Sequence, residues 1–249
     1  MIRLIQVLAL SLSLLIFLQA KAEDALDYRP PTASFSGKGA LLLPFANVLN
    51  INGAGTIEFW VSAQWEGKLE YDPAIIAYAG PEGPRFAVHL ASNAKGIGIY
   101  AGEYFEGVQY DFTDGALHYV AIVTTGDFID IYIDGIFQRT LGYGFADLPA
   151  TTFSIGSYSD RAAFIGEIGQ VRIWNEPIDQ DTLNKFALMP LLAQGPDAHP
   201  DIQALVAMST FANPNSNGFM VVEGEGEPNL TERVDQNFDD GVMTPVEAE

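Results

Sequence analysis

The chain has 249 residues, a formal net charge of −20 and no cysteine. The negative charge disfavours binding to nucleic acid and to anionic membranes, and the lack of cysteine excludes disulfide bonds. The fold must therefore rest on its hydrophobic core, which a chain of this length can build as one domain.

The N-terminal segment has the pattern of a secretory signal peptide. Arg3 precedes an apolar run over residues 4–18, and the Ala-Lys-Ala sequence that ends at Ala22 fits a cleavage site. A membrane anchor is the alternative, but the run is shorter than the ~20 apolar residues that a spanning helix needs. We therefore predict that residues 1–22 are removed, that no later segment spans a membrane, and that the protein is secreted or periplasmic.

Between residues 35 and 174, short apolar or alternating runs are separated by glycine, asparagine and aspartate, which predicts a β protein. Isoleucine at positions 129, 131 and 133 alternates with polar residues, so one face of that strand should lie in a core. Asp134-Gly135 follows and predicts a type I′ hairpin that pairs residues 128–134 with 136–141. The runs predict strands at residues 40–44, 55–65, 74–79, 85–92, 96–102, 108–113, 117–125, 128–134, 136–143, 152–157 and 164–174.

The C-terminal part has a different pattern. Residues 177–187 predict a short helix, which Pro190 ends, and residues 202–211 fit either a helix or an added strand. Residues 223–249 are rich in acidic residues, glycine and proline, which predicts a disordered tail. This tail is a solvating spacer or, in the alternative, engages a basic partner. The predicted organisation is a signal peptide over 1–22, one domain over 23–188, an extension over 189–222 whose packing is left open, and the acidic tail over 223–249.

Taken in order, the runs resemble the laminin G-like jelly rolls of the concanavalin A-like lectin and glucanase group. The resemblance covers residues 33–188 and includes the opening Phe35-Ser36-Gly37 segment, the tryptophan-bearing run over 56–61 and the long strand over 164–174. The number, order and spacing of the runs carry it. The fold class that it implies is all-β, with two antiparallel sheets in a jelly-roll sandwich, followed here by the short helix and the acidic tail.

The resemblance also bears on metal binding. Many relatives place an acidic residue where Ser36 stands, and again at Gly169 or Gln170, near a structural calcium ion. Calcium prefers several oxygen ligands that include carboxylates, and these positions are neutral here. We therefore expect this calcium site to be lost and predict no cofactor, while calcium bound at another position stays open.

No constellation of catalytic residues is evident. The related glucanases use two carboxylates on one face of a strand. In this chain Glu167 is followed on its own face by Gly169, and Glu103 and Glu106 fall on opposite faces of a regular strand. No zinc-ligand spacing and no Gly-x-Ser-x-Gly elbow accompanies the three histidines, which are His89, His118 and His199. The chain is predicted not to be an enzyme.

A polar surface is predicted instead, because apolar residues at 86, 88 and 90 facing a core leave the intervening residues facing outward. The mixture of polar groups and one aromatic ring suits sugar hydroxyls and the apolar face of a sugar. An ordinary solvated sheet face is the alternative. The candidate ligand-binding residues are Arg85, His89, Tyr100, Gln109 and Asp111, with Tyr104 of the expected loop over 102–107 as a second candidate.

These observations favour an exported, non-catalytic recognition module, whose partner is a glycan or a protein at the cell surface. The alternatives are a structural protein-interaction module that binds no sugar and, less favoured, a glycoside-active enzyme.

Overall fold

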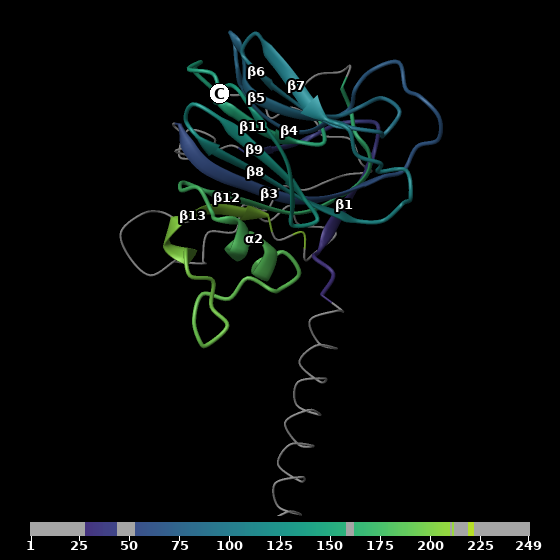
Figure 1. Cartoon of the computed structure of the whole chain (residues 1–249). Coiled ribbons are helices and arrows are strands. Elements are labelled where there is room, and N and C mark those ends of the chain that lie inside the picture. The colour runs from purple at the N-terminus through teal and green to yellow at the C-terminus, as the bar shows by residue number, and fades with distance from the viewer. Residues whose placement is uncertain (1–27, 44–52, 158–161, 210, 212–218, 222–249) are drawn as a thin grey trace, which may run out of the picture.

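A computed structural model of the chain describes residues 28–43, 53–157, 162–209, 211 and 219–221, and it confirms the predicted sandwich of two antiparallel sheets (Figure 1). The predicted signal peptide over 1–22 and acidic tail over 223–249 lie outside the described residues. Among the described residues, no helix is long and apolar enough to cross a membrane.

The two sheets are named A and B. Sheet A has eight strands, in the order β10 (Ile136–Leu141), β9 (Ile129–Ile133), β8 (His118–Thr125), β3 (Ala54–Ala63), β12 (Ile165–Trp174), β13 (Leu205–Ser209) and β14 (Phe219–Val221), with β1 (Thr32–Ser36) also paired to β12. Sheet B has six strands, in the order β2 (Leu41–Leu43), β11 (Thr152–Ile155), β4 (Ala74–Gly80), β5 (Gly83–Leu90), β6 (Ile97–Ala101) and β7 (Tyr104–Val108).

The main core lies between the sheets and is built by alternation along the strands. Ile129, Ile131 and Ile133 of β9 are all fully buried in it, as predicted, while Asp130 and Tyr132 between them are partly exposed. Burial of each such side chain contributes about 1.5–3 kcal/mol. Phenylalanines fill the space between, with Phe59, Phe86 and Phe153 on strands and Phe112 and Phe164 on loops.

The predicted hairpin is confirmed. Ile133 pairs with Ile136, and the two residues between them have positive φ, 50° at Asp134 and 75° at Gly135. A type I′ turn needs positive φ at both positions, which Asp-Gly tolerates better than most residue pairs. The turn therefore fixes the register of β9 and β10.

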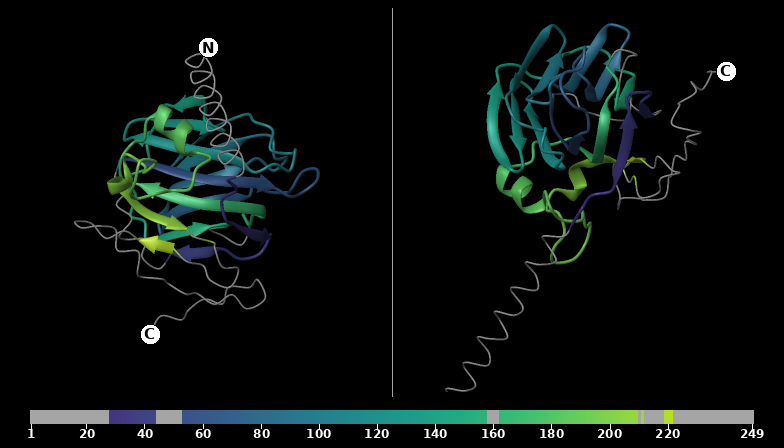
Figure 2. Two further views of the ribbon diagram at one scale, coloured as in Figure 1. Left: turned by 90° about the horizontal axis from the view of Figure 1, so that it is seen from below. Right: turned by 90° about the vertical axis from the view of Figure 1, so that its right-hand side faces the viewer.

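A second hydrophobic cluster covers the outer face of sheet A. Helix α2 (Gln180–Phe186) lies there and begins after Asp179, whose Oδ1 accepts hydrogen bonds of 3.0 Å from the N–H groups of Asp181 and Thr182. Leu183 packs with Trp60 and Trp174 from the sheet below. Residues 202–211, left open by the sequence, form a 3₁₀ turn (Ile202–Ala204) and then β13, which pairs with β12. Figure 2 shows α2 against one sheet, while the far side of sheet B is free of helix.

A charged pair is enclosed beneath this second layer. Glu58 of β3 and Arg172 of β12 are 1% and 0% exposed, and Arg172 Nη1 lies 3.5 Å from Glu58 Oε2. Tyr119 O–H and Trp174 Nε1–H donate to the two oxygens of Glu58 at 2.7 and 3.2 Å. The guanidinium lies over the Trp60 ring, 4.9 Å from its centroid. Each formal charge is thus compensated where water is excluded.

Arg172 also links this layer to the end of α2 and, through Gln170, to the first described residues. It donates to Gln170 Oε1 at 3.0 and 2.9 Å, and to the carbonyl oxygens of Phe186 and Met189 at 3.4 and 3.2 Å. Tyr28 O–H donates to the same Gln170 oxygen at 3.2 Å. The first described residues therefore lie on the side of sheet A that α2 covers.

Candidate functional site

The outward face of sheet B carries the predicted ligand residues of β5 and β6. Phe86, Val88 and Leu90 of β5 are buried in the main core, so Arg85, Ala87 and His89 face the other way. In the β5–β6–β7 register, Ala87 lies opposite Tyr100 and Tyr100 opposite Phe105. One row lower, His89 lies opposite Gly98 and Gly98 opposite Gly107. The strands are neighbours, so the predicted juxtaposition of His89 with Tyr100 exists.

A cleft of about 780 Å³ lies on this face, and we call it the Phe105 cleft. Phe105 is 45% exposed and stacks on Tyr100, which is 38% exposed, with ring centroids 4.3 Å apart and an angle of 25° between the planes. Gly98 makes this possible, because a Cβ there would lie 2.6 Å from the Phe105 ring. Besides Phe105, the lining includes Asp72, His89, Asn93, Lys95, Gln109, Gln138 and Arg139.

His89 was predicted to be an exposed ligand residue, and this is wrong as to exposure, since only 5% of its surface is accessible. Its Nδ1 lies 2.9 Å from the carbonyl oxygen of Asp72, and the edge of its ring meets Tyr100 at a centroid distance of 5.6 Å. Burial lowers the pKa of His89, although the hydrogen bond and the charge of Asp72 act in the opposite direction. The ring therefore lies at the floor of the cleft in its neutral form at pH 7.

Arg85 is on the predicted face but does not line the cleft. It is half-buried, and its Nη1 donates to the carbonyl oxygen of Leu148 at 3.1 Å. The segment between β10 and β11 therefore holds this guanidinium at the end of the strand, away from Phe105.

The expected strand over residues 108–113 is not formed, and the expected loop over 102–107 contains a strand. β7 spans Tyr104–Val108, so Gln109 and Asp111 lie in the loop that follows it. Gln109 is exposed and lines the cleft. Asp111 is exposed and accepts hydrogen bonds from the N–H and O–H groups of Thr113 at 3.0 and 2.6 Å, which lower its pKa. Asp111 therefore stabilises the loop and does not line the cleft.

Tyr104 does not line the cleft either. It is 64% exposed and stacks on Tyr143 at 5.3 Å, on the opposite side of β7 from Phe105, because successive residues of a strand alternate. The Tyr143 hydroxyl accepts from Glu106 N–H at 2.8 Å, and Arg139 donates to the carbonyl oxygen of Gly107 at 3.3 Å. The same Tyr143 hydroxyl donates to the carbonyl oxygen of Ile99 at 2.9 Å, so it bridges β6 and β7, and Arg139 occupies a backbone group of the edge strand.

Several lining residues were missed by sequence reasoning. Phe105 was treated as part of a loop, although a two-residue connection at Gly102-Glu103 gives the β6–β7 register that places it beside Tyr100. The others come from distant loops and from β10, and no local pattern brings them together; they are Asp72, Asn93, Lys95, Gln138 and Arg139.

The cleft offers little for acid–base catalysis. Asp72 is the one carboxylate among the lining residues that the structure describes, whereas glycoside hydrolysis commonly uses two. In the described part of the chain, no three histidine or carboxylate side chains gather where they could hold a metal ion.

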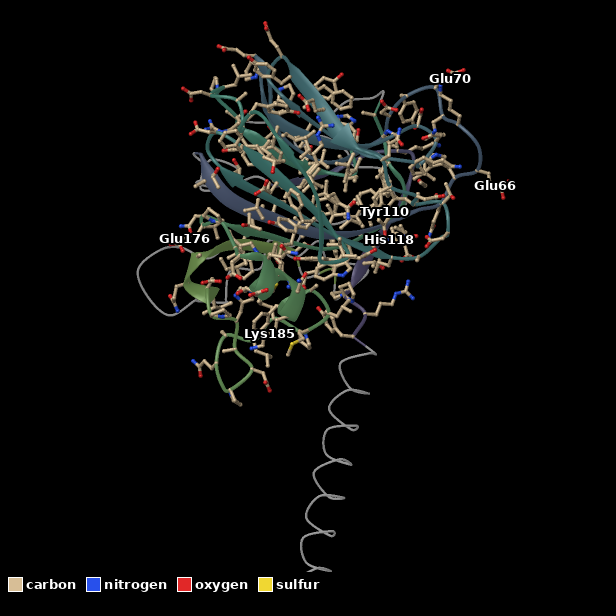
Figure 3. All side chains as sticks on the ribbon, in the orientation of Figure 1. Glu66, Glu70, Tyr110, His118, Glu176 and Lys185 are labelled. Atoms are coloured by element: carbon tan, nitrogen blue, oxygen red, sulfur yellow. The ribbon has the colours of Figure 1, made fainter. Side chains whose placement is uncertain are left out.

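His118 anchors the loop that carries Gln109. Its Nδ1 lies 2.8 Å from Asp134 Oδ2 and its Nε2 lies 3.1 Å from Asp114 Oδ1. Tyr110 O–H donates to the same Asp134 oxygen at 2.6 Å, and Figure 3 shows Tyr110 and His118 side by side. Burial favours neutral His118, but the hydrogen bonds and charges of the two aspartates raise its pKa above the usual value.

This raised pKa predicts that part of the stability depends on pH. A histidine whose folded pKa is raised contributes fully below its unfolded pKa, near 6.5, and loses the contribution as pH rises through the folded pKa. The informative quantity is the free energy of unfolding of wild type minus that of His118→Gln. We expect this difference to be about 0.5–1 kcal/mol larger at pH 5.5 than at pH 9. Urea denaturation at the two pH values measures this, and a constant difference would contradict it.

Known proteins have the same fold. The family model described as the concanavalin A-like lectin/glucanases superfamily matches residues 35–184. No curated protein sequence matches the chain. The structure of the Ruminococcus gnavus IT-sialidase CBM40 bound to alpha2,3 sialyllactose is similar, with a TM-score of 0.52, 16% identity, and 63% of this chain and 96% of that chain covered. For a putative carbohydrate binding protein from Bacteroides ovatus the values are 0.54, 15%, 73% and 52%.

Proposed function

The chain belongs to the concanavalin A-like lectin/glucanases superfamily, and from this premise we propose that it is an exported, non-catalytic module that binds carbohydrate on the outward face of sheet B. The observation that supports this proposal most directly is the Phe105 cleft. There the exposed Phe105–Tyr100 pair adjoins neutral His89 and three amide side chains, which are those of Asn93, Gln109 and Gln138. An aromatic face packs on the C–H groups of a sugar, and amides both donate to and accept from its hydroxyls.

The similar structures support this class of ligand. One is of a module bound to alpha2,3 sialyllactose and the other is described as a putative carbohydrate binding protein. The shortage of carboxylates in the cleft supports a role in binding rather than in hydrolysis.

The proposal includes the organisation of the chain. Residues 1–22 act as a cleaved export signal, residues 23–188 form the recognition domain, and residues 223–249 are a solvating tail. The extension over 189–222 contributes β13 to sheet A and so belongs with the sandwich. The protein acts in the periplasm or outside the cell.

Phe105→Ala tests the function. We expect affinity for the bound glycan to fall roughly tenfold, equivalent to about 1.4 kcal/mol, because the stacking surface is lost. Phe128→Ala is the matched control, since Phe128 is similarly exposed, at 51%, and lies next to β9 in sheet A. A glycan array identifies the ligand, and titration calorimetry measures both variants.

Equal binding by wild type and Phe105→Ala would place the ligand elsewhere. A blank array, together with a stable complex in pull-down experiments, would favour the structural protein-interaction module instead.

A further inference from the structure

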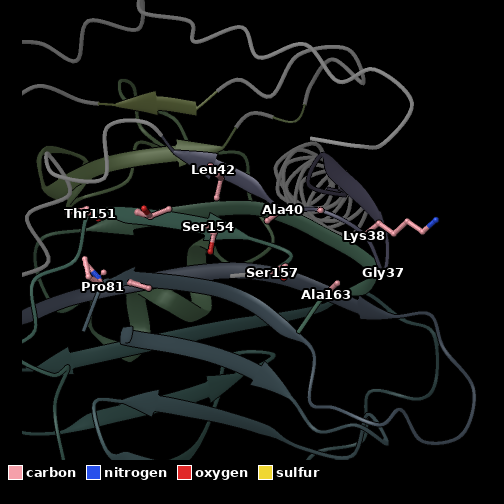
Figure 4. Close-up of a pocket in the computed structure, with 13 residues that line it drawn as sticks. Gly37, Lys38, Ala40, Leu42, Pro81, Thr151, Ser154, Ser157 and Ala163 are labelled. Carbon is pink, nitrogen blue, oxygen red and sulfur yellow. The ribbon is translucent and has the colours of Figure 1, made fainter. Parts of the chain in front are cut away.

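The Phe105 cleft is lined by strands of both sheets. A second cleft, of about 750 Å³, lies beside β2, β11 and β4 (Figure 4), and among the described residues no strand of sheet A and no aromatic ring lines it. The Phe105 cleft instead receives Gln138 and Arg139 from β10, the edge strand of sheet A. Two side chains of one sheet thus line a cleft on the other.

A β-bulge in β10 brings these two residues to the cleft. Phe137 lies opposite Tyr132 and contacts its ring on the outer face of sheet A, with a centroid distance of 5.6 Å. Arg139 lies opposite Ile131, whose side chain is buried in the main core. Gln138 between them is the extra residue of the bulge and has no partner in β9. The bulge therefore turns Arg139 toward sheet B, whereas a regular strand would point it to the same face as Phe137.

Arg139 ties the bulge to sheet B. Its Nη2 donates to Glu106 Oε2 at 2.8 Å, and its Nη1 donates to the carbonyl oxygen of Gly107 at 3.3 Å. Both acceptors belong to β7, which also carries Phe105. Gln138 is thereby held beside the strand that provides the aromatic surface of the cleft.

Gln138 is the least exposed of the three amide side chains that line the cleft, since it is half-buried whereas Asn93 and Gln109 are exposed. Its Nε2 donates to the carbonyl oxygen of Ile136 at 3.0 Å. Because that carbonyl can only accept, the contact fixes which end of the amide is the nitrogen. The Oε1 of Gln138 accepts no hydrogen bond within the described part of the chain. An amide that is already held in place loses less rotamer freedom on binding than an exposed one.

We propose that Gln138 is the specificity-determining residue of the Phe105 cleft, and that its Oε1 accepts a hydrogen bond from a hydroxyl of the sugar ring that packs on Phe105. This rests on the proposed function and deepens it. A site built to hydrogen-bond a hydroxyl rejects an analogue that lacks it, because the polar group of the site is then left unpaired. The extra residue of β10 thus selects among sugars that the aromatic ring alone would bind alike.

Removal of single hydroxyls from the ligand tests this. The methyl glycosides of glucose, galactose, mannose, xylose and arabinose, each with its monodeoxy analogues, are titrated into the full chain and followed by ligand-detected NMR. For the sugar that binds, we expect one monodeoxy analogue to bind wild type roughly five- to tenfold more weakly than the parent sugar. In Gln138→Ala the parent sugar should be weakened by a similar factor, and the same analogue should lose no further affinity.

Deletion of Gln138 is a second variant. Without the extra residue, Phe137 and Arg139 become neighbours on opposite faces, as a regular strand requires, so the hairpin and the contacts of Arg139 should persist. Binding should nevertheless fall as in Gln138→Ala, which decides alone should the deletion fail to fold. Thr140→Ala is the matched control, because Thr140 is an exposed residue of β10 that bonds to Asp130 and does not line the cleft.

Two failures are distinguishable. Equal affinities of wild type and Gln138→Ala, with the same losses among the analogues, would overturn the role of Gln138 and assign the bulge to protection of the sheet edge. Carbohydrate binding at the cleft would stand in that case if Phe105→Ala still weakened it. If none of the glycosides binds, recognition of a single ring hydroxyl is refuted, and with a blank array the proposed function fails as well.

Discussion

Arg172→Met should lower the free energy of unfolding by about 3–5 kcal/mol, the cost expected when one partner of a buried ion pair is removed. The change leaves the carboxylate of Glu58, 1% exposed, without a cation in a site closed to water. It also removes the donors to Gln170 and to the carbonyl oxygens of Phe186 and Met189. Urea denaturation followed by tryptophan fluorescence measures the loss.

Two comparisons isolate the cause. Arg29→Met breaks the ion pair with Glu167, whose N–O distance is 3.1 Å but whose arginine is 71% exposed, and should cost under ~1 kcal/mol. In Glu58→Gln/Arg172→Met neither charge remains, so the double variant should be less destabilised than the sum of the single changes. Additive effects would show that Arg172 acts through packing and its carbonyl contacts alone.

The second large effect is a loss of stability in acid caused by His199. This ring is 2% exposed and stacks on Trp174 at 4.4 Å and against Phe186 at 4.5 Å. Burial, with Arg172 nearby, lowers the pKa of His199 to about 4. Between pH 6.5 and pH 4, His199 is protonated in the unfolded chain but mostly neutral in the folded protein. The free energy of unfolding therefore decreases as the pH is lowered, by roughly 3 kcal/mol at pH 4.

His199→Phe should remove this dependence, because a phenyl ring keeps the stacking and cannot be protonated. Other groups titrate equally in both proteins, so the informative quantity is the difference between wild type and variant at pH 7 and at pH 4. His118 acts in the opposite direction, which makes wild-type data alone insufficient. Parallel stability curves for the two proteins would contradict a neutral buried His199.

The sequence predicts those parts of the fold that depend on local pattern. Alternation places Ile129, Ile131 and Ile133 in the core, and Asp134-Gly135 specifies the hairpin. Alternation misleads at residues 108–113, where Phe112 is buried although it lies in a loop. Its ring packs against Tyr110 and His118, so a loop anchored on side chains imitates the pattern of a strand.

The candidate site is only partly predictable for the same reason. Tyr100 is found because its strand alternates, but Gln138 and Arg139 reach the cleft from the other sheet. His89 is enclosed by Asp72 and Tyr100, which are separated from it in the sequence. Glu58 and Arg172 occupy outward positions that are buried only because α2 and the following segment cover them. Such contacts depend on tertiary packing that no local pattern encodes.

The two outer faces of the sandwich differ, because α2 covers that of sheet A and no described helix covers that of sheet B. Tyr28 lies on the covered side, while the Phe105 cleft opens on sheet B across the sandwich. A ligand that is part of a larger polymer can therefore approach sheet B without meeting α2 or Tyr28.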